Sequence, residues 1–150
     1  MSMKSLETQI LAPGYGIILV GSIVENGIVR TSSFLVGSLI GLVWLIAGVL
    51  VLMRASKDLK KGEQISLVQS GLFSVTRNPA LVAHFFAIMP GLCLLFNTNI
   101  GIVGIICAVV LFYRHIGAEE RELEERFGEV YQAYRERVSR LLPLPTAGMS

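Results

Sequence analysis

Residues 78–113 contain no aspartate, glutamate, lysine or arginine, and this charge-free stretch constrains the fold more than any other feature of the sequence. The stretch is too long for one helix across a bilayer, which takes about 20 apolar residues, and it suits two short crossings. Residues 97–99 (Asn-Thr-Asn) lie at its centre, and such side chains favour turns because they hydrogen-bond the neighbouring backbone. The stretch therefore predicts a membrane hairpin with helices at residues 79–96 and 100–116.

The composition also indicates a helical membrane protein. Of the 150 residues, 53% are hydrophobic and only 16% are charged, too few to cover the core of a soluble protein. Two further apolar stretches predict helices at residues 10–28 and 34–53. The first is expected to be a retained span, because no small-residue cleavage site follows it. The sequence thus predicts an all-α polytopic membrane protein, with residues 1–150 forming a single domain of about four transmembrane helices.

Lysine and arginine are distributed unevenly between the two sides of this predicted bundle. One side carries only Arg30, and the turn at residues 97–99 carries none. Positive residues concentrate on the cytoplasmic side of membrane proteins, which predicts that both termini and the loop before residue 77 are cytoplasmic. The basic residues of the loop up to residue 77 and of the C-terminal segment are Arg54, Lys57, Lys60, Lys61, Arg77, Arg114, Arg121, Arg126, Arg135, Arg137 and Arg140.

Residues 118–138 have the pattern of an amphipathic helix rather than that of a membrane span. Apolar residues recur at spacings of three and four, and the opposite face is charged. We expect this helix on the cytoplasmic side, against the spans or the lipid head groups. Prolines end regular structure after it, so residues 143–150 are expected to form a tail. The apolar stripe consists of Leu123, Phe127, Val130, Tyr131, Tyr134 and Val138.

The start of the predicted hairpin has the features of an anion site. Asn78 is a favoured N-cap residue and Pro79 a favoured first helical residue, so the third span is expected to begin at Pro79. The free amides of a helix start, together with the charge of Arg77, suit a carboxylate or a phosphate. From spacing alone, a capped helix with Arg77 anchored to lipid phosphate is the favoured interpretation.

Glu119 and Glu120 open the predicted amphipathic helix on the same side of the membrane. Acidic residues in a first helical turn are stabilised by the helix dipole, and spacing alone favours this simple role. The functional alternative is that one carboxylate accepts hydrogen bonds from hydroxyl or amino groups of a ligand. Neighbouring residues on a helix point about 100° apart, so one glutamate is expected to face a ligand and the other Arg114 or solvent.

His84 and Glu25 are ionisable residues that lie within the predicted spans. His84 is a functional candidate because it is in the membrane, but interhelical hydrogen bonding accounts for such a residue equally well. Glu25, at the far end of the first span, is expected to be solvated. The two cysteines and two histidines form no cluster, so no metal site is expected. A net charge of +2 gives no footprint for nucleic acid.

Several of these residues form a longer pattern whose order and spacing resemble one known superfamily. The C-terminal block is its specific part, since Arg-Asn-Pro alone is a weak signal. The pattern consists of Ser70-Gly71-Leu72-Phe73, Arg77-Asn78-Pro79-Ala80-Leu81, Glu119-Glu120-Arg121-Glu122-Leu123, Phe127-Gly128-Glu129-Val130-Tyr131-Gln132-Ala133-Tyr134, Val138 and Pro143. With it, residues 37–143 resemble the integral-membrane methyltransferases of the isoprenylcysteine carboxyl methyltransferase and phospholipid methyltransferase superfamily.

The resemblance implies a helical membrane enzyme that binds S-adenosylmethionine from the cytoplasm. It implies methyl transfer to a lipophilic or lipid acceptor that enters from the bilayer. It also implies that the Arg-Asn-Pro start and the glutamate pair hold the cofactor. The cofactor-binding candidates are Arg77, Asn78, Pro79, Leu81, Glu119 and Glu120, and the substrate-side candidates are Phe73, His84 and Arg114.

The sequence departs from the family pattern at three positions. Leu72 and Phe73 stand where the pattern has proline and tyrosine, and Leu81 stands where it has tyrosine. Two phenolic hydroxyls are thus missing, which favours a second hypothesis, a non-catalytic membrane protein of this fold that binds lipid or a partner. A third hypothesis is a four-span enzyme that uses glutathione, although its spans lack the arginine- and tyrosine-rich constellation expected for that chemistry.

Overall fold

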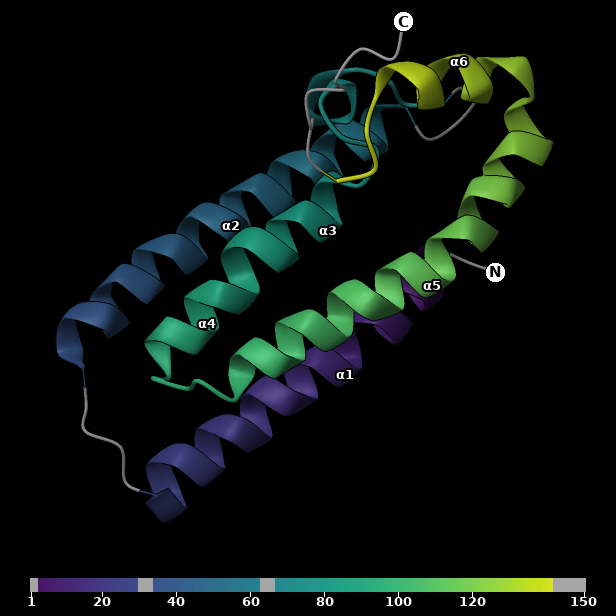
Figure 1. Ribbon diagram of the computed structural model, residues 1–150. Coiled ribbons are helices and arrows are strands. Elements are labelled where there is room, and N and C mark those ends of the chain that lie inside the picture. Colours follow the sequence, from purple (N-terminus) through teal and green to yellow (C-terminus); the bar gives the residue numbers. More distant parts are fainter. Residues whose placement is uncertain (1–2, 30–33, 63–66, 142–150) are drawn as a thin grey trace, which may run out of the picture.

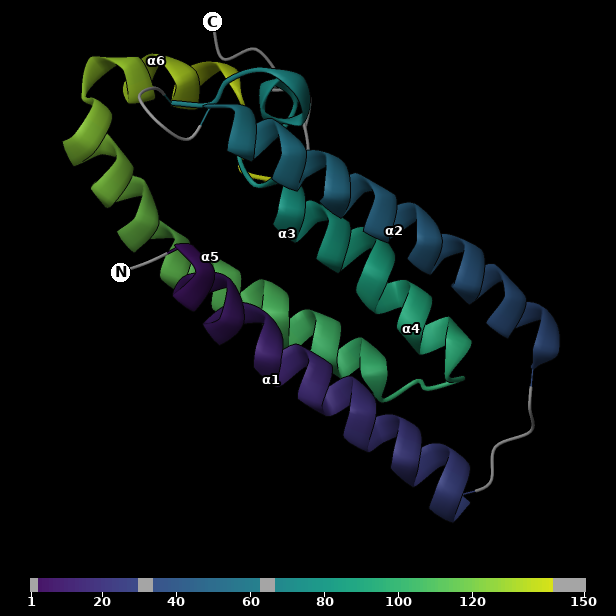
Figure 2. The same ribbon diagram turned by 180° about the vertical axis from the view of Figure 1, so that it is seen from behind.

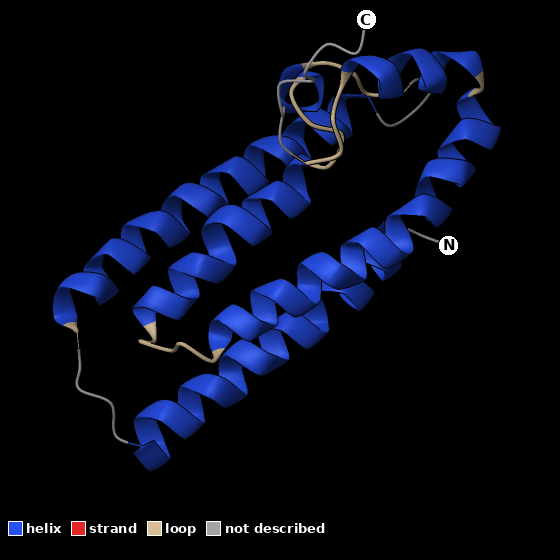
Figure 3. Cartoon of the chain, viewed as in Figure 1, coloured by secondary structure: helices blue, strands red, loops and turns tan. Residues whose placement is uncertain are grey.

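The computed structural model describes residues 3–29, 34–62 and 67–141. Helices account for most of these residues, and this described part contains no strand (Figure 3). An isolated parallel bridge joins Thr76 and Ser139. In chain order the elements are α1 (Met3–Ile23), the π-helical η1 (Val24–Val29), α2 (Leu35–Gly62), the 3-10 turn η2 (Gly71–Ser74), α3 (Pro79–Ala83), the π-helical η3 (His84–Ile88), α4 (Met89–Leu95), α5 (Gly101–Phe127) and α6 (Glu129–Arg137).

The long helices form two antiparallel pairs that lie side by side. Figures 1 and 2 show α2 running along α3, η3 and α4, while α1 runs along α5. The outward faces carry exposed apolar side chains such as Val43, Leu50 and Val103. An apolar surface of this extent suits hydrocarbon rather than water. The architecture is therefore that of an all-α polytopic membrane protein, as the composition predicts.

Three helical segments of the described part are long and apolar enough to cross a membrane: Leu6–Val29, Leu35–Lys60 and Gly101–Phe127. The third predicted span, at residues 79–96, corresponds to Pro79–Leu95, which is shorter than these three. It begins at Pro79 and ends before the turn at residues 97–99, so at 1.5 Å per residue it reaches only about 25 Å. The turn itself forms as predicted, with Asn97 in the left-handed conformation at a φ of 49°.

The predicted helix boundaries need correction at three places. The first helix begins at Met3 rather than at residue 10, and α2 continues beyond residue 53 to Gly62. The separate helices predicted at 100–116 and 118–138 are instead a continuous α5, Gly101–Phe127, followed by α6. The onset of charge after the span does not interrupt helical hydrogen bonding, because glutamate and arginine are good helix formers. The break falls at Gly128, whose φ of 53° is favourable for glycine.

Glycine pairs allow the close helix contacts in each layer. A Cβ atom on Gly14 of α1 would lie 2.7 Å from the Gly104 carbonyl oxygen of α5. A Cβ on Gly41 of α2 would lie 2.6 Å from the Gly91 carbonyl oxygen of α4. Backbones that approach this closely leave no room for a side chain, and such small-residue contacts are typical of membrane helix packing.

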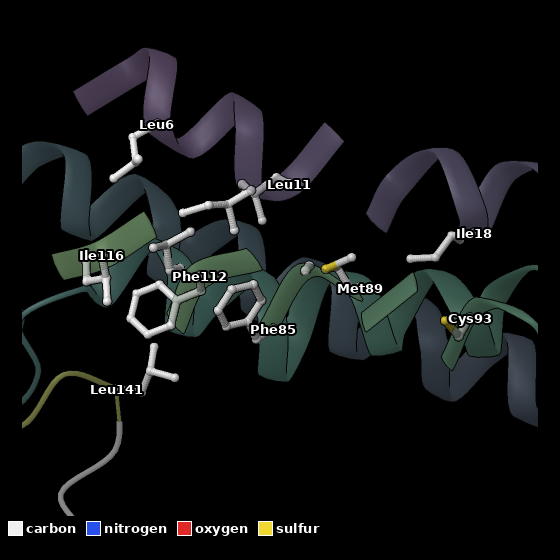
Figure 4. Close-up of a cluster of buried hydrophobic side chains, with 12 residues drawn as sticks. Leu6, Leu11, Ile18, Phe85, Met89, Cys93, Phe112, Ile116 and Leu141 are labelled. Atoms are coloured by element: carbon white, nitrogen blue, oxygen red, sulfur yellow. The ribbon is translucent and has the colours of Figure 1, made fainter. Parts of the chain in front are cut away.

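The main hydrophobic core fills the space between the two layers. It combines side chains of α1, of the α3–α4 hairpin arm and of α5 with Leu141, which follows α6 (Figure 4). Phe85 and Phe112 meet edge to face with ring centroids 5.9 Å apart. Leu141 lies against this group and is 9% exposed. The core therefore holds the end of the described chain beside the start of α3.

Glu25 is buried rather than solvated, which corrects the sequence expectation. Its side chain reaches the turn that joins α4 to α5. Oε2 accepts hydrogen bonds from the Thr98 hydroxyl and from the Ile100 amide at 3.2 Å. The carboxylate thus satisfies donors at the start of α5 from another helix, a role that no local pattern around Glu25 indicates.

We expect Glu25→Gln to lower the midpoint of thermal unfolding by several degrees in detergent micelles. The amide presents only one acceptor oxygen, so the donors of Thr98 and Ile100 lose charge-assisted bonds. Glu125→Gln is the matched control, because Glu125 is exposed on the last turns of α5. An equal effect of both substitutions would contradict the assigned role.

Candidate functional site

Arg77, Asn78 and Pro79 lie where the hairpin begins. Pro79 is the first residue of α3 and Asn78 occupies the N-cap position, as predicted. The Asn78 side chain, however, does not cap the helix. Its Nδ2 donates 3.0 Å to the Arg140 carbonyl oxygen, while its backbone amide donates 3.2 Å to the Thr76 hydroxyl. The predicted capping bond is wrong because a distant segment takes the side chain.

That distant segment comprises residues 139–141, which we call the C-terminal strap. The strap runs beside the segment that precedes α3, where Thr76 and Ser139 form the parallel bridge. These two segments are the neighbouring yellow and teal stretches in Figure 1. The Arg77 amide donates 2.9 Å to the Ser139 carbonyl oxygen. The Thr76 hydroxyl donates 3.1 Å to the Arg140 carbonyl oxygen. The strap therefore holds Arg140 close to Arg77.

Glu120 connects these two arginines. Its Oε1 lies 2.8 Å from Arg77 Nη1 and accepts from Arg140 Nε at 2.8 Å. Its Oε2 accepts from Arg140 Nη2 at 2.6 Å. The Glu120 residue is 6% exposed, and the hydrogen bonds to its carboxylate raise the pKa of Arg140. We call Arg77, Glu120 and Arg140 the polar cluster; its formal net charge is +1.

One donor of the cluster is unsatisfied. Arg77 Nε is buried and has no hydrogen-bond partner among the described residues. The side chain is 9% exposed, and its Nη1 also donates 3.3 Å to the Tyr131 hydroxyl of α6. Burial raises the pKa of Tyr131, so its hydroxyl is protonated at neutral pH. Because buried donors are nearly always paired, the free Nε favours a ligand acceptor at this position.

The other predicted site residues lie in different surroundings. Glu119 lies within electrostatic reach of Glu7 on α1 as well as of Glu120 in the cluster. Arg114 is exposed, and the structure does not bring it to the cluster. Leu81 is 3% exposed inside the hydrophobic core, so it cannot contact a ligand without a rearrangement. Of the glutamate pair, Glu120 is the one that faces inward, as the helical geometry of neighbouring residues suggests.

Phe73 contributes its backbone rather than its ring to a contact near the site. Its carbonyl oxygen accepts 2.7 Å from the hydroxyl of Tyr134. Burial raises the pKa of Tyr134 to about 12, which keeps this donor protonated. Tyr131, Tyr134 and Val138 form a small buried cluster, whereas Val130 of the predicted stripe is exposed. The kink at Gly128 changes the helical phase and turns Val130 outward.

Sequence reasoning missed Arg140, which was grouped only with the other basic residues. Its position at the end of the C-terminal block was the only available signal for Arg140. The residues around Arg140 in the sequence do not indicate that this segment packs against Arg77. A recess of about 620 Å³ lies elsewhere, along residues 50–60 of α2. In the described part, no group of three or more His, Cys, Asp or Glu residues is placed to hold a metal ion.

The chain matches a known protein family. The model of the isoprenylcysteine carboxyl methyltransferase (ICMT) family matches residues 35–125, which is more than half of the chain. The match runs from α2 through most of α5 and contains Arg77 and Glu120, but not α1 or the C-terminal strap. No curated protein and no solved structure matches the chain. The chain belongs to the isoprenylcysteine carboxyl methyltransferase family, which indicates a methyltransferase set in a membrane.

Proposed function

We propose that the protein transfers a methyl group from S-adenosylmethionine to a lipophilic or lipid acceptor at the cytoplasmic membrane face. In a chain of this family, the observation that carries the proposal is the ion pair between Arg77 and Glu120. Arg77 lies at the start of the hairpin, and Glu120 lies on α5, past the second membrane-spanning segment of the hairpin. The cytoplasmic placement is supported by the lysines and arginines that flank this end of the bundle.

The residues of the polar cluster fit the cofactor. S-adenosylmethionine carries a carboxylate, an amino group and ribose hydroxyls, and it supplies an electrophilic methyl group on its sulfonium. The unpartnered Arg77 Nε is a donor for the carboxylate. Glu120 is an acceptor for the amino group or the hydroxyls, in place of part of its contact with Arg140. Arg140, whose side chain is 42% exposed, is the partner that can turn to solvent.

The remaining contribution of the chain is alignment and exclusion of water. Methyl transfer is an in-line displacement whose rate depends on holding the two reactants in register. The strap and the core below it separate the cluster from water on one side. The exposed apolar helix faces admit an acceptor from the lipid phase, where water does not compete for the methyl group.

Ligand binding to the purified protein in detergent micelles tests the cofactor assignment. We expect S-adenosylmethionine and its demethylated product to bind in the micromolar range by calorimetry. Glu120→Gln should weaken this binding by at least tenfold, or about 1.4 kcal/mol. Glu124→Gln is the matched control, because Glu124 of α5 is also paired with an arginine, Arg135 of α6, but lies outside the cluster.

Absence of binding to the folded wild-type protein would refute the cofactor assignment. Stabilisation by glutathione in its place would support the glutathione hypothesis. The non-catalytic alternative is favoured by the present pairing of Glu120 with two arginines. Transfer of a labelled methyl group into a lipid extract by the wild-type protein, and its loss with Glu120→Gln, would exclude that alternative.

A further inference from the structure

A second polar pair lies apart from the polar cluster, within the membrane-spanning part. The Tyr15 hydroxyl of α1 and Nδ1 of His84 in η3 are 2.6 Å apart. Their rings meet edge to face with centroids 5.8 Å apart. Both side chains are half-buried at the edge of the hydrophobic core. Tyr15 lies outside the family match, which begins at residue 35.

The position of the pair relates it to the site. His84 follows Asn78 by six residues along one helical arm, so it lies about 9 Å deeper on the hydrocarbon side. In the proposed reaction, a lipophilic acceptor reaches the polar cluster from this side. The pair thus lies on the hydrocarbon side of the start of α3.

Two further observations indicate that the Tyr15–His84 pair does more than pack two helices together. His84 begins a π-helical segment, and such segments frequently occur at functional sites. The hydrogen bond to Tyr15 occupies Nδ1 alone, and no described residue bonds Nε2. An ionisable side chain in the membrane is costly to keep when an apolar one packs as well. The second ring nitrogen is therefore available to a ligand.

We propose that His84, held in place by Tyr15, binds the reacting group of the acceptor, and that this group is a neutral protic nucleophile: a thiol, a phenol or an amine on a lipophilic molecule. The inference rests on the proposed methyl transfer. In the tautomer that carries its proton on Nδ1, the ring donates to the Tyr15 hydroxyl, which orients it, and Nε2 presents its lone pair to the acceptor. An acceptor carboxylate would need no such base.

The proton and electron balance of the step is simple. The nucleophile forms a bond to the methyl carbon while the carbon–sulfur bond breaks and its electron pair remains on sulfur. The acceptor proton moves to His84 Nε2 and is released when the product leaves. Tyr15 acts as a positioning residue because it acts through His84.

A chromophoric probe tests the pair without turnover. The probe is a 4-nitrophenol with a dodecyl chain, titrated by absorbance in micelles with the protein and in empty micelles. We expect the protein-bound probe to ionise at a pH about 1 lower with the wild type than with His84→Gln, because His84 takes its proton. Tyr15→Phe should give an intermediate value. His115→Gln is the control, since among the described residues His115 hydrogen-bonds only the Leu111 carbonyl oxygen of its own helix.

The outcomes separate this proposal from the proposed function. If the probe titrates identically with wild type and with a folded His84→Gln variant, the acceptor role is wrong. Failure of S-adenosylmethionine to bind the wild type refutes the methyl transfer instead. With an acceptor in hand, His84→Gln should lower kcat by about 100-fold with the KM for the cofactor unchanged. A purely structural pair would lower the thermal midpoint and leave kcat of the folded fraction intact.

Discussion

Glu120→Ala is expected to lower the free energy of unfolding by about 3–5 kcal/mol, as for loss of one partner of a buried ion pair. The substitution removes the carboxylate that neutralises Arg77, whose side chain is 9% exposed. Arg140 can turn to water, but Arg77 cannot without opening the contact between α3 and the strap. The cost therefore arises mainly from one uncompensated buried charge.

Reversible chemical unfolding in detergent micelles measures this effect. Glu124→Ala, in an exposed pair with Arg135, should change the free energy of unfolding by less than about 1 kcal/mol. The double substitution of Glu120 and Arg77 by alanine should recover part of the loss, because the buried charge disappears with its partner. If Glu120→Ala and Glu124→Ala lower the free energy of unfolding by equally small amounts, the buried polar cluster does not stabilise the fold as its burial suggests.

Gly14→Val is expected to destabilise the fold by about 3 kcal/mol, at the upper end of the cost of overpacking. A Cβ at this position would lie 2.6 Å from the Met89 methyl carbon and 2.7 Å from the Gly104 carbonyl oxygen. The methionine can move, but the backbone oxygen of α5 cannot, so α1 and α5 must separate. The neighbouring Tyr15 would lose its position relative to His84.

Gly16→Val is a stringent control for this prediction. Gly16 lies two residues further along α1, and a Cβ there meets nothing within 4 Å. Both variants carry the same change in helix propensity, so a difference between their unfolding free energies reports the α1–α5 contact. Equal stability of the two variants would show that the helices do not approach as closely as described.

The elements that the sequence predicts well are those set by local chemistry. Pro79 cannot continue a preceding helix, and Asn97 tolerates a left-handed backbone, so the hairpin begins and turns where expected. The end of the fourth span was misplaced because charge marks the edge of hydrocarbon rather than the end of a helix. Gly128, which does end α5, was read only as part of a family pattern.

The site was predictable only in part, for a different reason. Arg77 and Glu120 were expected to meet because the hairpin returns the chain to the same membrane face. Arg140 reaches them through a tertiary contact more than 60 residues from Thr76 in sequence, and local periodicity carries no signal for it. The pairing of Glu25 with Thr98 was missed on the same grounds.

The C-terminal strap sets the order in which the molecule can be completed during synthesis. The ribosome makes the matched region, residues 35–125, before residues 139–141 exist, so Arg77 and Glu120 emerge without their third partner. Leu141, which packs in the core beside Phe112, is also added only after that region. A nascent chain stopped just after Gly128 would contain every family-matched residue and still lack a finished site. The region matched by the family model is thus shorter than the region that forms the polar cluster.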